Sequence, residues 1–305
     1  MTRHLDAVVI GAGPAGLTAA RVIANAGLSC LLIDRMGPGG QLMNMGELHE
    51  CPNIEPGTSG PDLISKLLDE AMTAGAELAV DDVTGLDGGA PWRIRAAEMP
   101  VTATALIVAT GLELGRTDLA EEATYEGRGL SHCAVCDGPL FAGKRVVVSG
   151  SDDWAAQEAI DLAAIVGHVT LVSDGTLAGL RPARRAKLGT LPNLHIVQGR
   201  VAALAGIDGL DAVVVETSGA LVRIDASGLF VYCNRQPATS VLAGLLATTP
   251  AGHIEVGCDQ QTSQPGIFAC GDVGNPAERI AMAIAEGEKA GQNAVRWVKS
   301  SMAGG

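Results

Sequence analysis

A glycine-rich loop between an apolar run and a helical segment constrains this chain more than any other feature. The run Leu5–Ile10 predicts a buried parallel strand, and Pro14–Ala26 predicts a helix that ends at Gly27. The loop between them, Gly11–Gly16, reads GAGPAG. Its first glycine allows a tight turn, its second lets the backbone approach a pyrophosphate, and its third lets helix and strand pack closely. We therefore expect a phosphate-binding βαβ unit at the start of the chain.

A second strand at Cys30–Ile33 completes this unit, and Asp34 follows the strand directly. A carboxylate about 20 residues beyond the glycine loop can accept hydrogen bonds from the ribose of an adenosine. The alternative is a glycine turn with a structural role alone. Spacing, context and the acid agree with one another, so the sequence favours dinucleotide binding.

The strand–helix–strand pattern recurs in the middle of the chain. Its parts are a strand at Arg145–Ser149, a helix near Trp154–Val166 that ends at Gly167, and a strand at Val169–Val172. Other predicted elements are a hairpin or meander at Trp92–Ala96 and Val101–Val108, strands at Ala212–Glu216 and Leu229–Cys233, and a last helix at Arg279–Ser300. The predicted fold class is α/β, with two Rossmann-like nucleotide-binding domains, doubly wound and three-layered.

Charge and hydropathy exclude some classes of partner. Lys and Arg total 21 against 34 Asp and Glu, which gives a net charge of −13. Such a surface repels phosphate backbones and anionic headgroups, so we expect no nucleic-acid or membrane partner. No apolar run reaches the roughly 18 residues that a membrane span needs. The glycine loop also begins where a signal peptide would lie, so a cytoplasmic location is expected.

Cys133 and Cys136 form the one CxxC pair among seven cysteines. Two thiols one helical turn apart can cycle between dithiol and disulfide. The alternative, half of a zinc site, needs a second ligand pair. The other cysteines are isolated and are interpreted as packing residues: Cys30, Cys51, Cys233, Cys258 and Cys270. The pattern therefore favours redox chemistry and no metal site.

Two residues beside the pair are candidate proton-transfer groups. Asp137 follows Cys136 and could protonate a leaving thiolate, although Asp-Gly-Pro is also ordinary turn chemistry. His132 precedes Cys133 and could lower its pKa or relay a proton. The alternative for His132 is a solvent-exposed turn histidine.

These residues resemble the low-molecular-weight thioredoxin reductase family, and the match runs over most of the chain. The matching motifs are Gly11–Gly16, Gly39–Leu42 (GGQL), Ala109–Gly111 (ATG), Ser131–Gly138 (SHCAVCDG) and Gly266–Val273 (GIFACGDV), and Arg279 also fits. The resemblance implies a two-domain homodimer with FAD held by residues 1–112 and 245–305. It also implies a central domain over residues 117–240 that is inserted in the first domain and has the CxxC near its start.

The resemblance further implies which residues hold FAD. Gln41 and Asn53 would line the flavin side, and Asp272 would bind the ribitol chain. Arg279 and Ile280 would lie near the pyrimidine end of the isoalloxazine; the family usually has Gln at position 280, so Ile280 would contribute its backbone. The complete predicted set is Gly11, Gly13, Pro14, Ala15, Gly16, Asp34, Gly40, Gln41, Leu42, Asn53, Ala109, Thr110, Gly111, Gly271, Asp272, Arg279 and Ile280.

The second βαβ unit departs from the family. Its turn, Ser149–Trp154, reads SGSDDW. Trp154 stands where the pattern predicts a small packing residue, while Asp152 and Asp153 would face a pyrophosphate. A phosphate site there would be both blocked and repelled.

The following strand also lacks the family's His-Arg-Arg cluster, which grips the 2′-phosphate of NADPH, and reads Ser173-Asp174-Gly175 instead. Asp174 alone suggests a ribose and hence NADH, but the glycines that would support this are missing. Later cations could compensate, although a solvated basic face is the favoured interpretation of Arg181, Arg184 and Arg185.

The sequence therefore predicts an FAD-dependent thiol-disulfide oxidoreductase that works without NADPH. In one version, a small dithiol or a thioredoxin-like protein is oxidised and oxygen reoxidises the flavin. In the other, an external carrier such as ferredoxin reduces the flavin, and thioredoxin receives the electrons. The alternatives are a conventional NADPH-dependent thioredoxin reductase and a non-catalytic flavin redox sensor; the intact CxxC-Asp disfavours the sensor.

Overall fold

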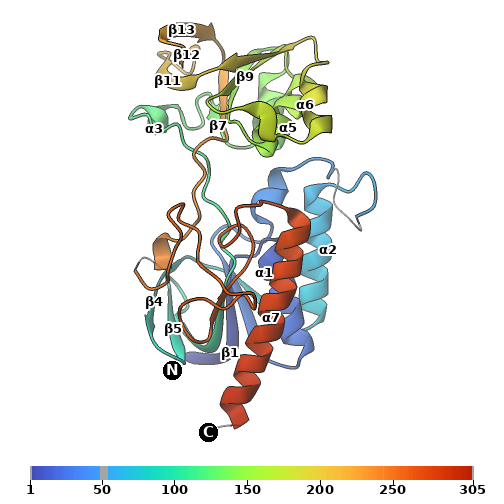
Figure 1. The fold of residues 1–305 in the computed structure, drawn as a ribbon, viewed down its shortest axis with the longest axis vertical. Coiled ribbons are helices and arrows are strands. Elements are labelled where there is room, and N and C mark those ends of the chain that lie inside the picture. Colours follow the sequence, from blue (N-terminus) through green and yellow to red (C-terminus); the bar gives the residue numbers. More distant parts are fainter. Residues whose placement is uncertain (1, 49–53, 243, 304–305) are drawn as a thin grey trace. The chain divides into compact units, whose positions relative to one another are not determined.

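The computed structural model describes residues 2–48, 54–242 and 244–303. The chain divides into two compact units, Met1–Glu113 with Gln236–Gly305, and Leu114–Arg235 (Figure 1). After the second unit, Ala238 donates its N–H to Gly111 O at 3.0 Å and accepts from Thr110 Oγ1 at 2.7 Å. These bonds return the chain to the first unit.

The first unit is built on a seven-stranded sheet with the order β3-β2-β1-β6-β5-β4. Its strands are β1 (Arg3–Ile10), β2 (Cys30–Asp34), β3 (Glu77–Val80), β4 (Val83–Gly88), β5 (Trp92–Ala96), β6 (Val101–Val108) and β15 (Ile267–Ala269). β6 pairs antiparallel with β5 over its first half and parallel with β15 over its second half. β1, β2, β3 and β6 are parallel neighbours. The expected meander therefore exists, but β6 is also a central strand of the parallel sheet.

Two hydrophobic layers cover this sheet. Alternate residues of β1 face opposite sides: Ala7 and Val9 pack with the helices, while Val8 and Ile10 pack with β4, β5 and the segment around Leu242. The helices are α1 (Pro14–Asn25), α2 (Gly60–Thr73) and α7 (Ile280–Ala303), which lie side by side in Figure 1, with the short turns η1 (Gly40–Asn44) and η4 (Ser240–Leu242).

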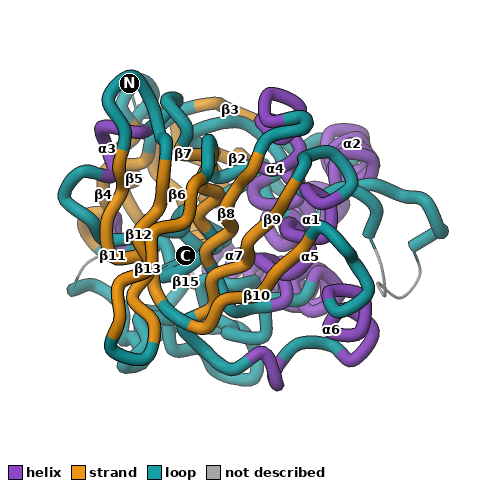
Figure 2. Tube along the Cα trace, turned by 90° about the horizontal axis from the view of Figure 1, so that it is seen from above, coloured by secondary structure: helices purple, strands orange, loops and turns teal. Residues whose placement is uncertain are grey.

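The second unit has a five-stranded parallel sheet with the order β10-β9-β8-β14-β7. Its strands are β7 (Leu130–Ser131), β8 (Arg145–Ser149), β9 (His168–Ser173), β10 (Leu194–Gln198) and β14 (Gly228–Val231). Figure 2 shows β8, β9 and β10 running side by side. A separate antiparallel sheet consists of β11 (Arg200–Ala205), β12 (Ala212–Thr217) and β13 (Ala220–Asp225).

Helices and the small sheet cover opposite faces of the parallel sheet. Val146 and Val148 of β8 pack with the helical side, and Val147 packs with residues of β11 and β12. The helices on the helical side are α4 (Ala134–Asp137), α5 (Asp153–Ala163) and α6 (Pro182–Leu188), with the turns η2 (Gly138–Phe141) and η3 (Leu177–Gly179). The short helix α3 (Glu122–Tyr125) instead packs Tyr125 with the small sheet. The predicted α/β class with parallel sheets is confirmed. Among the described residues, no helix combines the length and apolar character needed to cross a membrane.

Candidate functional site: a dinucleotide cradle and a redox disulfide

The predicted cofactor residues of the first unit follow the carboxyl ends of parallel strands. β2 lies on one side of β1 and β6 on the other, so the strand order reverses between β1 and β6. A crevice for a ligand opens at such a switch point in α/β folds. Asp34, the last residue of β2, lies at this edge, and the segments after β1, β6 and β15 supply Gly11, Ala109 and Gly271 to it.

The glycine loop is shaped for a ligand backbone. Gly11 has φ +103°, and a Cβ there would lie 2.3 Å from Ala109 O. A Cβ on Gly16 would lie 1.9 Å from Gly11 O, so neither position accepts a side chain. Gly13 differs, because a Cβ there would meet nothing within 4 Å. It is also the N-cap of α1 and provides no side-chain cap, and Pro14 begins the helix. The free amides at this helix start suit a pyrophosphate.

Asp34 holds the same loop. Its carboxylate accepts hydrogen bonds from Ala12 N at 2.8 Å, Met36 N at 2.9 Å and Gly37 N at 3.1 Å. It fixes the β1–α1 and β2–η1 turns against each other, and its remaining lone pairs are open to a ribose.

The η1 segment reaches the loop through its first residue. A Cβ on Gly40 would lie 3.6 Å from Gly13 Cα. Gln41 is half-buried, whereas Leu42 is buried in the core under the sheet. The Leu42 side chain is thus part of the core, so only the Leu42 backbone is available to a ligand. Asn53 lies outside the described residues.

The other side of the crevice is built on β6 and β15. Ala109 N donates to Ile10 O at 2.8 Å, which ties the turn after β6 to β1. Gly271 has φ +74°, a Cβ there would lie 3.0 Å from Ala15 Cβ, and its N–H donates to Glu286 Oε2 at 2.9 Å. Asp272 is half-buried beside it. The sequence did not single out Glu286, because nothing in its spacing marks a residue in α7 as a partner of β15.

The start of α7 completes this side. Arg279 is exposed, and Ile280, the first helical residue, packs half-buried against the core. Farther along α7, a Cβ on Gly287 would lie 2.2 Å from Ala15 O, so α7 approaches α1 closely. An open space at Gly13, uncapped amides and a carboxylate together fit a dinucleotide such as FAD.

In the second unit, Cys133 and Cys136 form a disulfide with a Cα–Cα distance of 5.3 Å. The pair follows β7, and Cys133 is the N-cap of α4, where its sulfur accepts from Cys136 N at 3.0 Å. Cys133 is half-buried and Cys136 exposed. The two cysteines therefore lie one helical turn apart at the start of α4.

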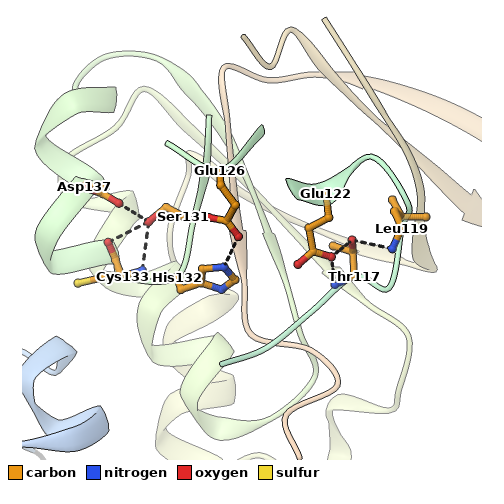
Figure 3. A network of polar contacts seen from close by, with 8 residues as sticks. All are labelled: Thr117, Leu119, Glu122, Glu126, Ser131, His132, Cys133 and Asp137. Carbon is orange, nitrogen blue, oxygen red and sulfur yellow. Dashed lines mark hydrogen bonds and ion pairs between the residues drawn. The ribbon is translucent and has the colours of Figure 1, made fainter. Parts of the chain in front are cut away.

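Asp137 is linked to the pair through Ser131 (Figure 3). Ser131 Oγ donates to Asp137 Oδ2 at 2.6 Å and accepts from Cys133 N at 3.1 Å. The sequence did not assign a role to Ser131, although it lies in the matched motif. The Ser131 hydroxyl fixes the Asp137 carboxylate next to the dithiol.

His132 is not a solvent-exposed turn histidine. Its side chain is 16% exposed, and Nε2 lies 3.0 Å from Glu126 Oε1. Glu122, Glu126 and His132 bring one ligating atom each to within 4.8 Å of one another. Glu122 accepts from Thr117 N at 2.8 Å, so this cluster is part of a hydrogen-bond network around α3 (Figure 3).

A buried polar cluster forms hydrogen bonds with the backbone of the CxxC segment. Ala134 N donates to Tyr232 OH at 3.0 Å and to Glu158 Oε2 at 3.2 Å, and Tyr232 OH donates to Glu158 Oε2 at 2.8 Å. Glu158 is fully buried, and burial raises its pKa to about 7. Burial also raises the pKa of Tyr232. The sequence reasoning missed Glu158. Helical spacing could have found it, because it shares a face with the buried Ala155 and Leu162.

The remaining free cysteines differ among themselves. Cys30 and Cys270 are buried, as predicted for packing residues, and burial raises the pKa of Cys30 to about 12. Cys233 is half-buried, and its sulfur accepts from Ser149 Oγ at 3.4 Å. The packing interpretation is wrong for Cys258, which is exposed. Cys51 lies outside the described residues.

At the second glycine turn, a side chain of the protein itself caps the N-terminus of the following helix. Asp152 is the N-cap of α5, accepts from Ala155 N at 2.8 Å and pairs with Arg235. The expectation that Trp154 blocks a small packing position is wrong. A Cβ on Gly150 would lie 2.5 Å from Ala155 Cβ, so Ala155 is the small packing residue.

Trp154 instead packs beside the buried cluster. Its ring stacks on Tyr232 with centroids 6.3 Å apart, and the Arg235 guanidinium lies 5.0 Å from its centroid. Trp154 thus supports the cation that pairs with the N-cap carboxylate.

The expectation of a solvated basic face is wrong for two of the three arginines. Arg181 Nε and Arg184 Nη1 lie 2.7 Å and 3.3 Å from Asp153 Oδ2, and both side chains are largely buried. Arg185 is exposed. Asp153 is thus neutralised by Arg181 and Arg184, which the sequence analysis interpreted as part of a solvated basic face.

The register corrects the interpretation of Asp174 as well. Gly11 N donates to Ile33 O at 2.8 Å, and Gly150 N donates to Val172 O at 3.0 Å. Ser173 therefore takes the place of Asp34, and Asp174 lies one residue beyond, where it accepts from Ser151 Oγ at 3.2 Å.

A dinucleotide cradle in one unit and a CxxC disulfide in the other define this protein as a disulfide oxidoreductase with a dinucleotide cofactor. The family model for pyridine nucleotide-disulphide oxidoreductases matches residues 5–287. The chain is 34% identical to a thioredoxin reductase of Listeria monocytogenes, over 96% of this chain and 94% of that protein.

Two further comparisons agree. The chain is 34% identical to the NADPH-dependent thioredoxin reductase 3 of Arabidopsis thaliana, over 92% of this chain and 55% of that protein. The crystal structure of Lactococcus lactis thioredoxin reductase superposes with a TM-score of 0.92 at 30% identity, over 97% of this chain and 99% of that one. The chain belongs to the pyridine nucleotide-disulphide oxidoreductase family and has the fold of its low-molecular-weight thioredoxin reductases. It is a flavin-dependent disulfide oxidoreductase.

Proposed function

We propose that this enzyme binds FAD at the crevice of the first unit and exchanges two electrons between the flavin and the Cys133–Cys136 pair. The open space at Gly13, the uncapped start of α1 and the Asp34 carboxylate support FAD binding. The bound flavin would supply two-electron redox chemistry. The residues proposed to hold it are Gly11, Gly13, Pro14, Ala15, Gly16, Asp34, Gly40, Gln41, Leu42, Asn53, Ala109, Thr110, Gly111, Gly271, Asp272, Arg279 and Ile280.

Around the disulfide, Asp137 is proposed to give a proton to the thiolate that leaves when an external disulfide is reduced, and to take it back in the reverse direction. Its hydrogen bond from Ser131 supports this role, because it holds the carboxylate beside the pair. His132 is the second candidate, although its Nε2 is paired with Glu126.

We further infer that NADPH is not the electron partner. The observation that carries this inference is Asp152, which stands at the N-cap of α5, where Gly13 stands at the N-cap of α1. The Asp152 carboxylate takes the Ala155 amide and the Arg235 cation that a pyrophosphate would use. Asp153 likewise takes Arg181 and Arg184.

The partner is then a dithiol or disulfide substrate, a thioredoxin-like protein or a small molecule. Either the substrate reduces the pair and oxygen reoxidises the flavin, or an external carrier of the ferredoxin type reduces the flavin and thioredoxin receives the electrons. A homodimer in the cytoplasm completes this proposal.

A conventional NADPH-dependent thioredoxin reductase is the second candidate. The names of the relatives favour it, since the Arabidopsis protein is called NADPH-dependent and the Listeria protein a thioredoxin reductase.

Anaerobic titration of the flavin-loaded protein separates the two candidates. Portions are titrated with NADPH, NADH and dithiothreitol, and the flavin absorbance is recorded. We expect dithiothreitol to bleach the flavin with up to about two equivalents, because the disulfide and the flavin each take two electrons, and both pyridine nucleotides to leave most of it oxidised. Stoichiometric bleaching by NADPH would establish the conventional reductase instead.

A further inference from the structure

Glu158 is a fully buried carboxylate in direct contact with the redox segment. Its Oε2 accepts from the N–H of Ala134, the residue that follows Cys133, and from the hydroxyl of Tyr232. Ala134 and Tyr232 are themselves buried. A change of charge on Glu158 is therefore felt at the backbone that carries the reactive sulfur, because the two groups are in direct contact inside the protein.

The other oxygen of this carboxylate is left without a partner. Glu158 Oε1 is buried and makes no hydrogen bond within the described residues, and the same holds for Trp154 Nε1. The indole nevertheless lies near enough to oppose the rise in the Glu158 pKa. A buried carboxylate oxygen without a donor is costly when charged and is relieved by a proton.

Few charged groups surround this site. Tyr232, after β14, and Asp161, on α5, act on Glu158, the first lowering its pKa by a hydrogen bond and the second raising it by repulsion. From α4 come Cys133, Cys136 and Asp137, and from α6 comes Arg184, which is paired with Asp153. Arg235 lies over the Trp154 ring and is paired with Asp152. The described neighbours therefore include no cation paired with Glu158.

We propose that Glu158 is a positioning residue for the dithiol that binds a proton when the Cys133–Cys136 disulfide is reduced and releases it when the disulfide forms again. The proposal rests on the proposed function only in taking Cys133–Cys136 as the pair that reacts.

The reaction balances as a thiol-disulfide exchange. An external dithiol reduces the protein disulfide: the protein S–S bond breaks, the dithiol forms its own disulfide, and two electrons pass to the protein sulfurs. The two thiol protons pass with them or are lost to solvent, depending on pH. Glu158 adds one proton from solvent to this balance.

The direction of the pH dependence follows from repulsion between like charges. Reduction replaces a neutral disulfide by sulfurs that carry negative charge as they ionise, and a negative neighbour raises the pKa of a carboxyl. In the disulfide form, the Glu158 pKa is about 7. Above that pH, the disulfide form holds a carboxylate while the reduced form still holds the acid. Reduction therefore becomes less favourable as the pH rises through this window.

Equilibration of the flavin-loaded protein with reduced and oxidised dithiothreitol, without oxygen, tests this. The dithiol fraction is read by alkylation and mass spectrometry from pH 6 to pH 9 in the wild type and in Glu158→Gln. An extra proton makes the exchange constant of the wild type fall, relative to that of Glu158→Gln, by up to about tenfold per pH unit above 7. Parallel curves for the two proteins would overturn the proposal.

Two further variants test the proposal even if Glu158→Gln does not fold. Asp161→Asn removes a repulsion that raises the Glu158 pKa, so this variant should retain the wild-type slope while its window moves to lower pH. Tyr232→Phe removes a hydrogen bond that lowers the Glu158 pKa, so the window should move to higher pH. A lost slope in Asp161→Asn, or an unmoved window in Tyr232→Phe, would contradict the assignment to Glu158. None of these readouts involves NADPH, so a failure here is distinct from a failure of the proposed electron partner.

Discussion

The two βαβ units of this protein have the same kind of turn before their helices, but they differ in what occupies the helix N-terminus. Both turns start with a glycine of positive φ, +103° at Gly11 and +158° at Gly150, whose N–H bonds to the neighbouring strand. The N-cap then differs, because Gly13 leaves the amides of α1 uncapped and Asp152 caps those of α5. A side-chain carboxylate satisfies the donors that a phosphate would otherwise satisfy. On the proposal that NADPH is not the electron partner, one residue at the N-cap closes the second nucleotide site while the fold is retained.

The largest expected effect separates the chemistry of the second unit from cofactor binding in the first. Cys133→Ser and Cys136→Ser should each eliminate disulfide turnover, since exchange needs both sulfurs. The flavin should stay bound, which its absorbance after gel filtration would show. Turnover retained in either variant would show that another cysteine takes part in the exchange.

Substitution of the two N-cap residues probes the comparison directly. Gly13→Val should abolish flavin retention, because its side chain would occupy the space open to a pyrophosphate. Apart from Gly13 itself and the adjoining chain, no atom of the described residues lies within 4 Å of the new Cβ, so the unfolding midpoint of the apoprotein should change little. Asp152→Val is the matched control and should keep its flavin. Full flavin content in Gly13→Val would refute the first site.

Removal of the charge at the second N-cap should partly open that site. Asp152→Asn retains a capping side chain but removes a repulsion of about 1 kcal/mol or more on a pyrophosphate. We expect flavin reduction by NADPH to become roughly 5- to 10-fold more efficient at low NADPH concentration. Asp153→Asn is the control, because its carboxylate already pairs with Arg181 and Arg184. An unchanged rate in Asp152→Asn would show that the carboxylate is not what excludes NADPH.

The smallest effect concerns stability. Asp152→Ala removes the cap of α5 and a partner of Arg235, whose side chain is 7% exposed. A lost cap costs about 1 kcal/mol, and the loss of one partner from a partly exposed pair adds a similar amount. Urea unfolding should therefore show a loss of about 2 kcal/mol, smaller in Asp152→Asn. Equal losses in the two variants would mean that the cap contributes nothing.

Much of this architecture could be predicted from the sequence, because strand periodicity and glycine spacing are local signals. The ranges of β5, β6 and β8 agree with those expected. The partners of the acids in the second unit could not be predicted. Arg235 reaches Asp152 from 83 residues away, and the sequence gives no spacing for such a pair. Glu158 could have been found from its place on the buried face of α5, but its hydrogen bond from Tyr232, 74 residues away, could not.

The claim that the second site is closed to NADPH is tested most directly by anaerobic stopped-flow spectroscopy. The flavin-loaded enzyme is mixed with sub-millimolar NADPH and, separately, with a dithiol, and the flavin absorbance is followed. The Asp152 carboxylate at the N-cap and the engagement of the nearby arginines by Asp152 and Asp153 should weaken NADPH binding by roughly a hundredfold or more. We predict slow and incomplete reduction by NADPH and rapid reduction by the dithiol. Complete flavin reduction by micromolar NADPH within seconds would contradict the account and identify a conventional NADPH-dependent thioredoxin reductase.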